Sequence, residues 1–292
     1  MKYIQLPPYQ QLDLFVDTQA SQLHNLMLDY LIDHNTQAAL HLLDQLKAEL
    51  PEDPMLPALH TLLEGLTHSW PAIHEGFHYG QSVLQPLAEQ WFKSESARWM
   101  AAYWKKLATQ AMTTMTASTE LPLNELHPAA LFLKAGDYQT ARDTISALPC
   151  WWQQCPTLDW MLSSLLQENS LDSAWSLLFE LAWLYPETCV ARIESCKISR
   201  LQSAHSQFEM NLPAESMQDT VWFPAWMLLQ EPALCSLVKT ARYPEQENWG
   251  KAFETVMNMQ IHHRDNPHYR QDHYRRLLQQ WHPGLLQASL HH

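Results

Sequence analysis

Two stretches of equal length predict a repeated fold: LHNLMLDYLIDHNTQAALHLLDQLKAELP at 23–51 and LDWMLSSLLQENSLDSAWSLLFELAWLYP at 158–186. In each, apolar residues fall on one face of a helix, pass through a polar turn, and then fall on one face of a second helix. The offset between the stretches is constant, and eight positions keep their class across it: Leu23, Leu26, Met27, Tyr30, Ala39, Leu43, Leu46 and Pro51. We therefore expect a helical hairpin that occurs more than once.

The residue types explain why such a stretch forms a hairpin. A small residue such as Ala39 or Ala174 lets the second helix approach the first closely, and the proline at position 51 or 186 ends the second helix. A third, partial unit runs from Phe132 to Pro149, with Gly136 at the expected turn between its helices.

The offset (158 − 23 = 135) is one less than four periods of 34 (4 × 34 = 136), and the residue classes resemble the pattern of the tetratricopeptide-repeat family. This resemblance implies an all-α protein whose antiparallel helical hairpins stack as an array or a right-handed solenoid. It also implies a non-catalytic scaffold, adaptor or chaperone-like assembly factor that binds a peptide or a partner helix and needs no cofactor.

Composition agrees with an all-α chain. Leucine occurs 46 times, whereas valine and isoleucine together occur 13 times, which favours helices over strands. The hairpin pattern predicts N-terminal helical repeats over 1–111 and central hairpins over 126–204. The Thr-rich run MTTMTASTELPLNE at 112–125 is expected to be a linker, and 205–292 a C-terminal helical segment.

The sequence also indicates a cellular compartment. No apolar run is long enough for a membrane span, and the first ten residues, MKYIQLPPYQ, do not resemble a secretory signal. An odd number of cysteines, five, suits reduced thiols in the cytoplasm. The thiols of Cys150 and Cys155, in CWWQQC, are expected to be buried and structural, because their spacing does not match a zinc site.

Charge is distributed unevenly along the chain. Residues 1–220 carry 11 basic and 25 acidic side chains, whereas residues 221–292 carry 7 and 6. An acidic body repels phosphate backbones, so we expect another protein with a basic face as the partner, and no nucleic acid. Asp29 and Asp33 on the first hairpin are the expected contacts, and a homo-oligomer is compatible with the same features.

One motif suggests a different class of function. The segment HEGFH at 74–78 matches the HExxH pattern, in which two imidazoles bind zinc and a glutamate activates water. In this alternative the protein is a zinc-dependent hydrolase with His74 and His78 as ligands and Glu75 as the catalytic base. Glu89, Glu95 or a residue distant in the sequence would be a third ligand. The other interpretation of the motif is a helix or loop with surface histidines, since glycines at 76 and 80 weaken a helix.

Two further features are candidates for partner binding. The segment 261–277 is locally basic, and its residues Arg270, Tyr274 and Arg275 suit a protein interface, although a solvated helix face is the alternative. Trp222 and Trp226 lie four residues apart on one expected helix, where they either line a groove or belong to the core, and Trp99 and Trp104 raise the same question.

Overall fold

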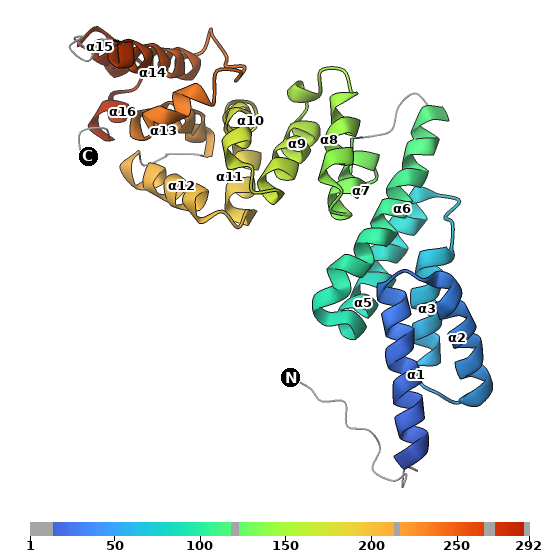
Figure 1. Ribbon diagram of the computed structural model, residues 1–292. Coiled ribbons are helices and arrows are strands. Elements are labelled where there is room, and N and C mark those ends of the chain that lie inside the picture. The colour runs from blue at the N-terminus through green and yellow to red at the C-terminus, as the bar shows by residue number, and fades with distance from the viewer. Residues whose placement is uncertain (1–13, 118–122, 213–216, 266–271, 289–292) are drawn as a thin grey trace. The chain divides into compact units, whose positions relative to one another are not determined.

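The structure is a computed structural model that describes residues 14–117, 123–212, 217–265 and 272–288. All regular structure within these ranges is helical, which confirms the all-α prediction (Figure 1). The chain divides into two compact units, which we call unit 1 (Met1–Asp137) and unit 2 (Tyr138–His292). Helices that follow one another in sequence pack against each other within each unit.

The described residues of unit 1 form α-helices interrupted by one π-helical turn and one 3₁₀ turn. Its elements are α1 (Leu14–Ile32), α2 (Thr36–Glu49), α3 (Leu56–Thr67), α4 (Ile73–Tyr79), the π-helix Gly80–Leu84, α5 (Gln85–Phe92), the 3₁₀ turn Lys93–Glu95, α6 (Ser96–Ala117) and α7 (Pro128–Lys134). Helix α7 packs along α6, and α1 packs on α2.

Unit 2 begins with α8 and alternates longer helices with 3₁₀ turns. Its elements are α8 (Tyr138–Ser146), the 3₁₀ turn Trp151–Gln153, α9 (Cys155–Gln167), α10 (Leu171–Leu184), α11 (Pro186–Ser195), α12 (Ser199–Asn211), the 3₁₀ turn Met217–Trp222, α13 (Phe223–Gln230), the 3₁₀ turn Pro232–Ser236, α14 (Asn248–Asp265), α15 (Asp272–Trp281) and α16 (Pro283–Ala288).

Three helices end in the same backbone motif. A residue at the end of each helix is left-handed: φ is 56° at His34, 71° at Gly136 and 55° at Asn169. The next backbone N–H donates to a carbonyl five residues earlier, at 2.9, 2.9 and 3.0 Å, from Asn35 to Tyr30, from Asp137 to Phe132 and from Ser170 to Leu165. This is the Schellman motif, which satisfies carbonyls that the end of a helix leaves without partners. The turns at His34 and Asn169 are separated by the same offset as the sequence pattern (169 − 34 = 135).

The core of unit 2 is rich in aromatic side chains. Phe179 of α10 contacts Phe253 of α14 edge to face, with ring centroids 5.9 Å apart, and it contacts Phe223 of α13 at 6.5 Å. Trp226 stacks on Phe223 and is only 1% exposed. The prediction that Trp226 contacts a partner is therefore wrong, because its indole is part of this core. In unit 1, Trp99 and Trp104 are likewise buried, at 0% and 4% exposed.

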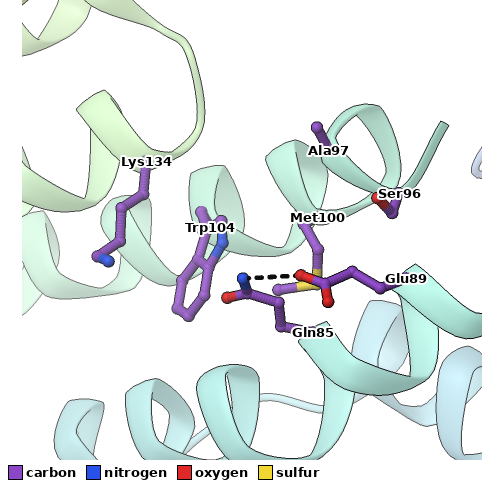
Figure 2. A pocket seen from close by; sticks show the side chains of 7 residues that line it. All are labelled: Gln85, Glu89, Ser96, Ala97, Met100, Trp104 and Lys134. Carbon is purple, nitrogen blue, oxygen red and sulfur yellow. Dashed lines mark hydrogen bonds between the residues drawn. The ribbon is translucent and has the colours of Figure 1, made fainter. Parts of the chain in front are cut away.

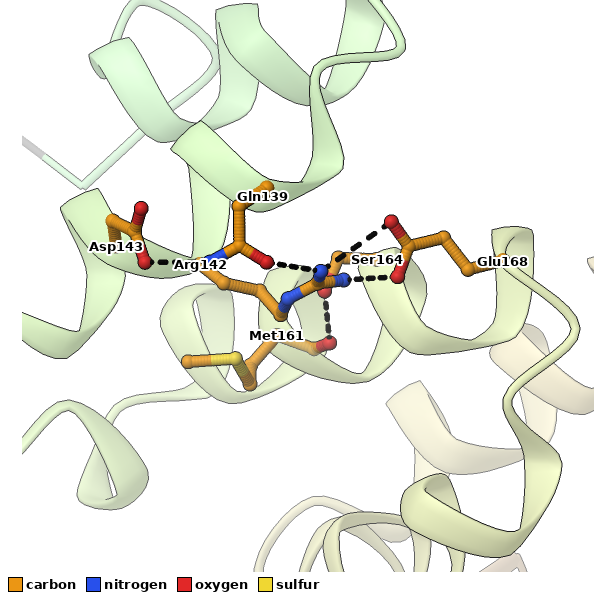
Figure 3. Close-up of polar contacts among 6 residues, drawn as sticks. All are labelled: Gln139, Arg142, Asp143, Met161, Ser164 and Glu168. Atoms are coloured by element: carbon orange, nitrogen blue, oxygen red, sulfur yellow. Dashed lines mark hydrogen bonds and ion pairs between the residues drawn. The ribbon is translucent and has the colours of Figure 1, made fainter.

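Two arginines tie helices of unit 2 together. The guanidinium of Arg142 in α8 donates to both carboxylate oxygens of Glu168, at 2.6 and 3.3 Å, and to the amide oxygen of Gln139 at 2.7 Å (Figure 3). Arg192 of α11 makes a similar fork to Asp159 of α9, at 2.7 and 2.6 Å. Two parallel bonds fix both distance and orientation, so these pairs set how the helices approach.

Some expected boundaries and environments differ from the structure. Helix α6 continues to Ala117, inside the predicted linker at 112–125, and the division into units falls at Asp137. The expectation that the CWWQQC thiols are buried is wrong for Cys150, which is exposed, and Cys155 is half-buried. Cys150 itself has φ = 51°, a left-handed conformation at the start of the 3₁₀ turn. No helix in the described part of the chain is long and apolar enough to cross a membrane.

Candidate functional site

One cavity in unit 1 brings charged, aromatic and amide side chains together (Figure 2). Its volume is about 210 Å³, and we call it the α5–α6 cavity. The residues that line it come from α5, from α6 and from the end of α7: Gln85, Glu89, Ser96, Ala97, Met100, Trp104 and Lys134. A negative and a positive side chain thus reach the same cavity from different helices.

The floor of the cavity is apolar and belongs to α6. Met100 and Trp104 lie four residues apart, so they share one face of the helix, and they are only 5% and 4% exposed. Ring contacts support Trp104, because the centroid of Phe77 lies 5.7 Å from it and that of Tyr103 lies 5.2 Å from it. The indole is therefore held in place by packing.

Two glycines let bulky side chains, those of α6 among them, approach closely. A Cβ atom on Gly80 would lie 2.5 Å from a ring carbon of Tyr103 and 2.6 Å from one of Trp104. A Cβ atom on Gly76 would lie 2.7 Å from the indole of Trp70 and 2.8 Å from Leu107. Carbon atoms do not pack at such distances, so only glycine fits. These residues, which reduce helix propensity, thus create the surface that α6 packs on.

The helix changes character at the same place. The hydroxyl of Tyr103 donates a hydrogen bond of 2.5 Å to the carbonyl of Gly76. The Gly80 N–H reaches both the Gly76 and the Phe77 carbonyl, and the next turn, Gly80–Leu84, is a π-helix. Burial raises the pKa of Tyr103, so its hydroxyl stays a hydrogen-bond donor. A π-helical turn widens a helix locally, and here it lies between α4 and the two cavity residues of α5.

Lys134 provides the positive charge of the cavity. Its ammonium lies over two aromatic rings, 5.4 Å from the centroid of Phe77 and 5.7 Å from that of Trp104. Such cation–π contacts are worth about 0.5–1 kcal/mol at exposed sites. Lys134 forms no ion pair with any carboxylate in the described part of the chain, so its ammonium keeps N–H donors for a ligand.

Glu89 provides the negative charge. It lies one turn after Gln85 on the exposed face of α5, and the Gln85 side-chain N–H donates to one carboxylate oxygen at 3.1 Å. This bond uses one N–H of the Gln85 side-chain amide and leaves the amide oxygen of Gln85 as an acceptor. Glu89 has no ion pair within the described ranges, so this end of the cavity presents acceptors and a net negative charge.

The HEGFH motif lies on α4, which is short. His74, Glu75 and His78 are all exposed, whereas Gly76 and Phe77 between them are buried. The two imidazoles are four residues apart on a helix, as the motif requires. In the described ranges no group of three or more His, Cys, Asp or Glu residues is placed to hold a metal ion. Zinc hydrolysis through these residues stays a prediction that nothing in the structure tests.

Both acidic residues expected on the first hairpin are exposed at the end of α1. Asp29 makes no ion pair with another described residue, whereas Asp33 lies 3.8 Å from Arg98, which also lies 3.7 Å from Glu95. Such exposed pairs contribute little, at most about 1 kcal/mol. Asp29 is thus the more available contact for a basic partner.

The C-terminal candidates are placed differently from one another. Arg275 is exposed on α15, and Tyr274 is half-buried and stacks on His262, with centroids 6.0 Å apart. Trp222 is half-buried beside His282, at 4.7 Å, so only part of its indole is available to a partner. Arg270 lies outside the described residues.

A second cavity of about 220 Å³ lies in unit 2, between α14 and the loop before it. Its floor includes Phe253 and Val238, each 1% exposed, and its rim carries Lys239 and Glu254. Unlike Lys134 of the α5–α6 cavity, Lys239 lies over no aromatic ring of the described residues.

Two buried histidines link the fold to pH. His127 is 1% exposed and caps α7: its Nδ1 accepts the Ala129 N–H at 3.2 Å. His205, in α12, is 5% exposed and packs edge to face on Phe223. Burial lowers the pKa of both groups below the ordinary value of 6.5, so folding favours the neutral imidazoles.

We expect acid to destabilise unit 1 through His127. The pKa of His127 is lower in the folded chain than in the unfolded chain. The neutral imidazole therefore contributes its full stability above about pH 6.5, and this contribution is lost as the pH falls through the pKa of the folded chain. Replacing His127→Asn keeps a side-chain acceptor for the cap and removes the titrating group. Urea unfolding at a series of pH values should show a flatter pH dependence for this variant. The same slope in both proteins would contradict a role for His127.

The sequence alone does not identify the residues of the α5–α6 cavity as a site. It presents Glu89 only as a possible zinc ligand, and it gives Lys134 no role beyond the turn next to Gly136. The four-residue spacings of Gln85 with Glu89 and of Met100 with Trp104 are visible in the sequence, but they do not show that α5, α6 and α7 meet. No protein-family model, curated protein or solved structure matches this chain.

Proposed function

We propose that the protein is a non-catalytic interaction scaffold of the tetratricopeptide-like kind, which binds another protein through an acidic surface of unit 1. The observation that carries this proposal is the exposed face of the α1–α2 hairpin. Leu26 and Asp29 of α1 are exposed three residues apart, and Leu40 and Asp44 of α2 are exposed four residues apart. Leu26 and Leu40 are 40% and 53% exposed, so apolar surface lies close to the carboxylates on both helices.

Charge supports a basic partner. Unit 1 carries 7 basic and 15 acidic residues over positions 1–137, a balance of −8, out of −13 for the chain. Neither Asp29 nor Asp44 forms an ion pair within the described part of the chain. Carboxylates next to exposed leucines give the mixture of apolar contact and charge that specific protein interfaces use.

The shared backbone motifs support the repeat-like architecture. The left-handed turns at His34, Gly136 and Asn169 have offsets of 102 (136 − 34) and 33 (169 − 136), close to multiples of 34. Five free cysteines in the described ranges support a cytoplasmic location, where thiols stay reduced.

Affinity capture with charge-reversed variants tests this function. The full-length tagged protein is incubated with native cell extract at low and moderate salt, and bound proteins are quantified by mass spectrometry. We expect a stoichiometric partner with a basic face that is released as salt rises, because screening weakens contacts between exposed charges. The Asp29→Lys/Asp44→Lys double variant should lose this partner at low salt.

The Glu245→Lys/Glu247→Lys double variant is the matched control, because both residues are exposed carboxylates of unit 2 without an ion pair in the described ranges. It should capture the partner as the unmodified protein does. The proposal fails if no stoichiometric partner is recovered, or if the Asp29→Lys/Asp44→Lys variant captures as much as the control.

A further inference from the structure

The two charges of the α5–α6 cavity lie at opposite ends of an apolar floor. Figure 2 shows Lys134 on one side and Glu89 on the other, with Trp104, Gln85 and Met100 between them. The two side chains form no ion pair with each other. In a cavity of about 210 Å³, an uncompensated cation and an uncompensated anion are thus separated by an indole and a thioether.

Each end selects one kind of chemical group. The ammonium of Lys134, positioned over Phe77 and Trp104, offers N–H donors to a carboxylate. The opposite rim offers the Glu89 carboxylate and the Gln85 amide oxygen, which are acceptors and suit an ammonium. The floor of Trp104 and Met100 suits a methylene chain, because both are apolar and almost fully buried.

We infer that the α5–α6 cavity binds a lysine-type group, in which a carboxylate and an ammonium are joined by a flexible methylene chain. The carboxylate pairs with Lys134, the ammonium pairs with Glu89 and Gln85, and the methylenes lie on Trp104 and Met100. Free lysine carries this group, and so does a lysine at the C-terminus of a protein.

Ligands with one charge fit less well. A simple carboxylate satisfies Lys134 but leaves Glu89 without a counter-ion, and a simple amine leaves Lys134 without one. Lys134 and Glu89 are exposed, so each missing charge pair is expected to reduce affinity about threefold. The cavity therefore discriminates by requiring both charges.

Calorimetric titration with three probes of similar length tests the inference on the full-length protein. The probes are 6-aminohexanoic acid, hexanoic acid and hexylamine. We expect 6-aminohexanoic acid to bind about threefold more tightly than either of the others. If 6-aminohexanoic acid bound no more tightly than hexanoic acid or hexylamine, the inference would be overturned.

Variants assign the contacts. Lys134→Met and Glu89→Gln keep the approximate size of each side chain and remove its charge, and each should weaken binding of 6-aminohexanoic acid about threefold. The matched controls are Lys47→Met and Glu52→Gln, exposed residues of unit 1 without ion pairs in the described ranges. Circular dichroism and thermal unfolding verify that each variant is folded. Unchanged binding in both folded cavity variants would exclude this cavity as the site.

A last pair of probes distinguishes the two sources of the group. A short peptide that ends in a free lysine is compared with the same peptide carrying a C-terminal amide. Tighter binding of the free-acid peptide supports recognition of a protein C-terminus, and binding of free lysine alone supports a small-molecule site. Equal binding of both peptides would contradict the carboxylate contact with Lys134. These probes bind without a partner protein, so their result is independent of the capture experiment.

Discussion

Replacing Arg242→Ala should lower the free energy of unfolding of unit 2 by about 2 kcal/mol, within the range for removing a hydrogen-bond partner of a buried acceptor. The Arg242 side chain is 46% exposed, so water screens part of its interaction with Glu180. Glu180 lies within α10, and its side chain is only 2% exposed. The Arg242 guanidinium gives it bonds of 3.0–3.2 Å, and the Arg242 backbone N–H donates at 2.9 Å. The variant removes the guanidinium and leaves a buried carboxylate with the backbone bond alone.

The two tryptophans of CWWQQC add to this effect. The guanidinium carbon of Arg242 lies 4.8 Å from the ring centroid of Trp152 and 5.5 Å from that of Trp151. These contacts also hold the 3₁₀ turn at 151–153 against the loop that contains Arg242. Their loss should make the variant more sensitive to proteolysis near this turn.

Equilibrium unfolding in urea measures the effect, with Arg200→Ala as the control. Arg200 pairs with Glu231 at the surface. The Arg200 side chain is 51% exposed and that of Glu231 is 35% exposed, so removing this ion pair should lower the free energy of unfolding by less than about 1 kcal/mol. Burial already raises the pKa of Glu180, and without Arg242 the protonated form becomes more favourable still. The stability deficit of Arg242→Ala should therefore shrink as the pH falls. Similar losses in the two arginine variants would contradict the importance of burial.

Replacing Gly80→Ala should destabilise unit 1 by about 2 kcal/mol, although alanine is the better helix former. The exchange gains about 1 kcal/mol of helix propensity. Against this, the new methyl group lies 2.5 Å from Tyr103 and 2.6 Å from Trp104, both almost fully buried. Overpacking costs about 1–3 kcal/mol and more where the neighbours cannot move, so the steric cost outweighs the gain in helix propensity.

Gly65→Ala is the matched control in the same unit. Its Cβ atom would meet the end of the Leu84 side chain at 2.7 Å, and a flexible leucine can move away where two packed aromatic rings cannot. We expect Gly65→Ala to change stability by less than about 1 kcal/mol. Thermal and urea unfolding measure both variants. If Gly80→Ala proved as stable as Gly65→Ala, α6 would not pack on the glycine face as closely as the structure shows.

Gly76 and Gly80 are helical although glycine disfavours a helix. In the sequence, Gly76 and Gly80 are residues that weaken a helix, which argues against a helix at 74–78. In the structure both are helical, because side chains pack closely on them: Trp70 and Leu107 on Gly76, and Tyr103 and Trp104 on Gly80. The contacts with residues 103, 104 and 107 come from a distant helix, and local propensity contains no information about such contacts.

The two tryptophans that the sequence presents as candidate partner contacts lie in different environments. Periodicity places Trp222 and Trp226 on one helix face, but Trp226 belongs to the core and only Trp222 reaches the surface. A shared face does not by itself show whether that face meets solvent or another helix. The pairing of Arg242 with Glu180, 62 residues earlier in the chain, has no local signal at all.

An all-α chain with helical hairpins at 23–51 and 158–186 can be predicted from the sequence, because helix period, turn residues and terminating prolines act over a few neighbouring positions. Which side chains contact one another is seen only in the folded chain: Tyr103 and Trp104 on Gly80, Lys134 and Glu89 around one cavity, and Arg242 on Glu180. Those meetings depend on the packing of helices far apart in the chain, where shape and burial select the partners.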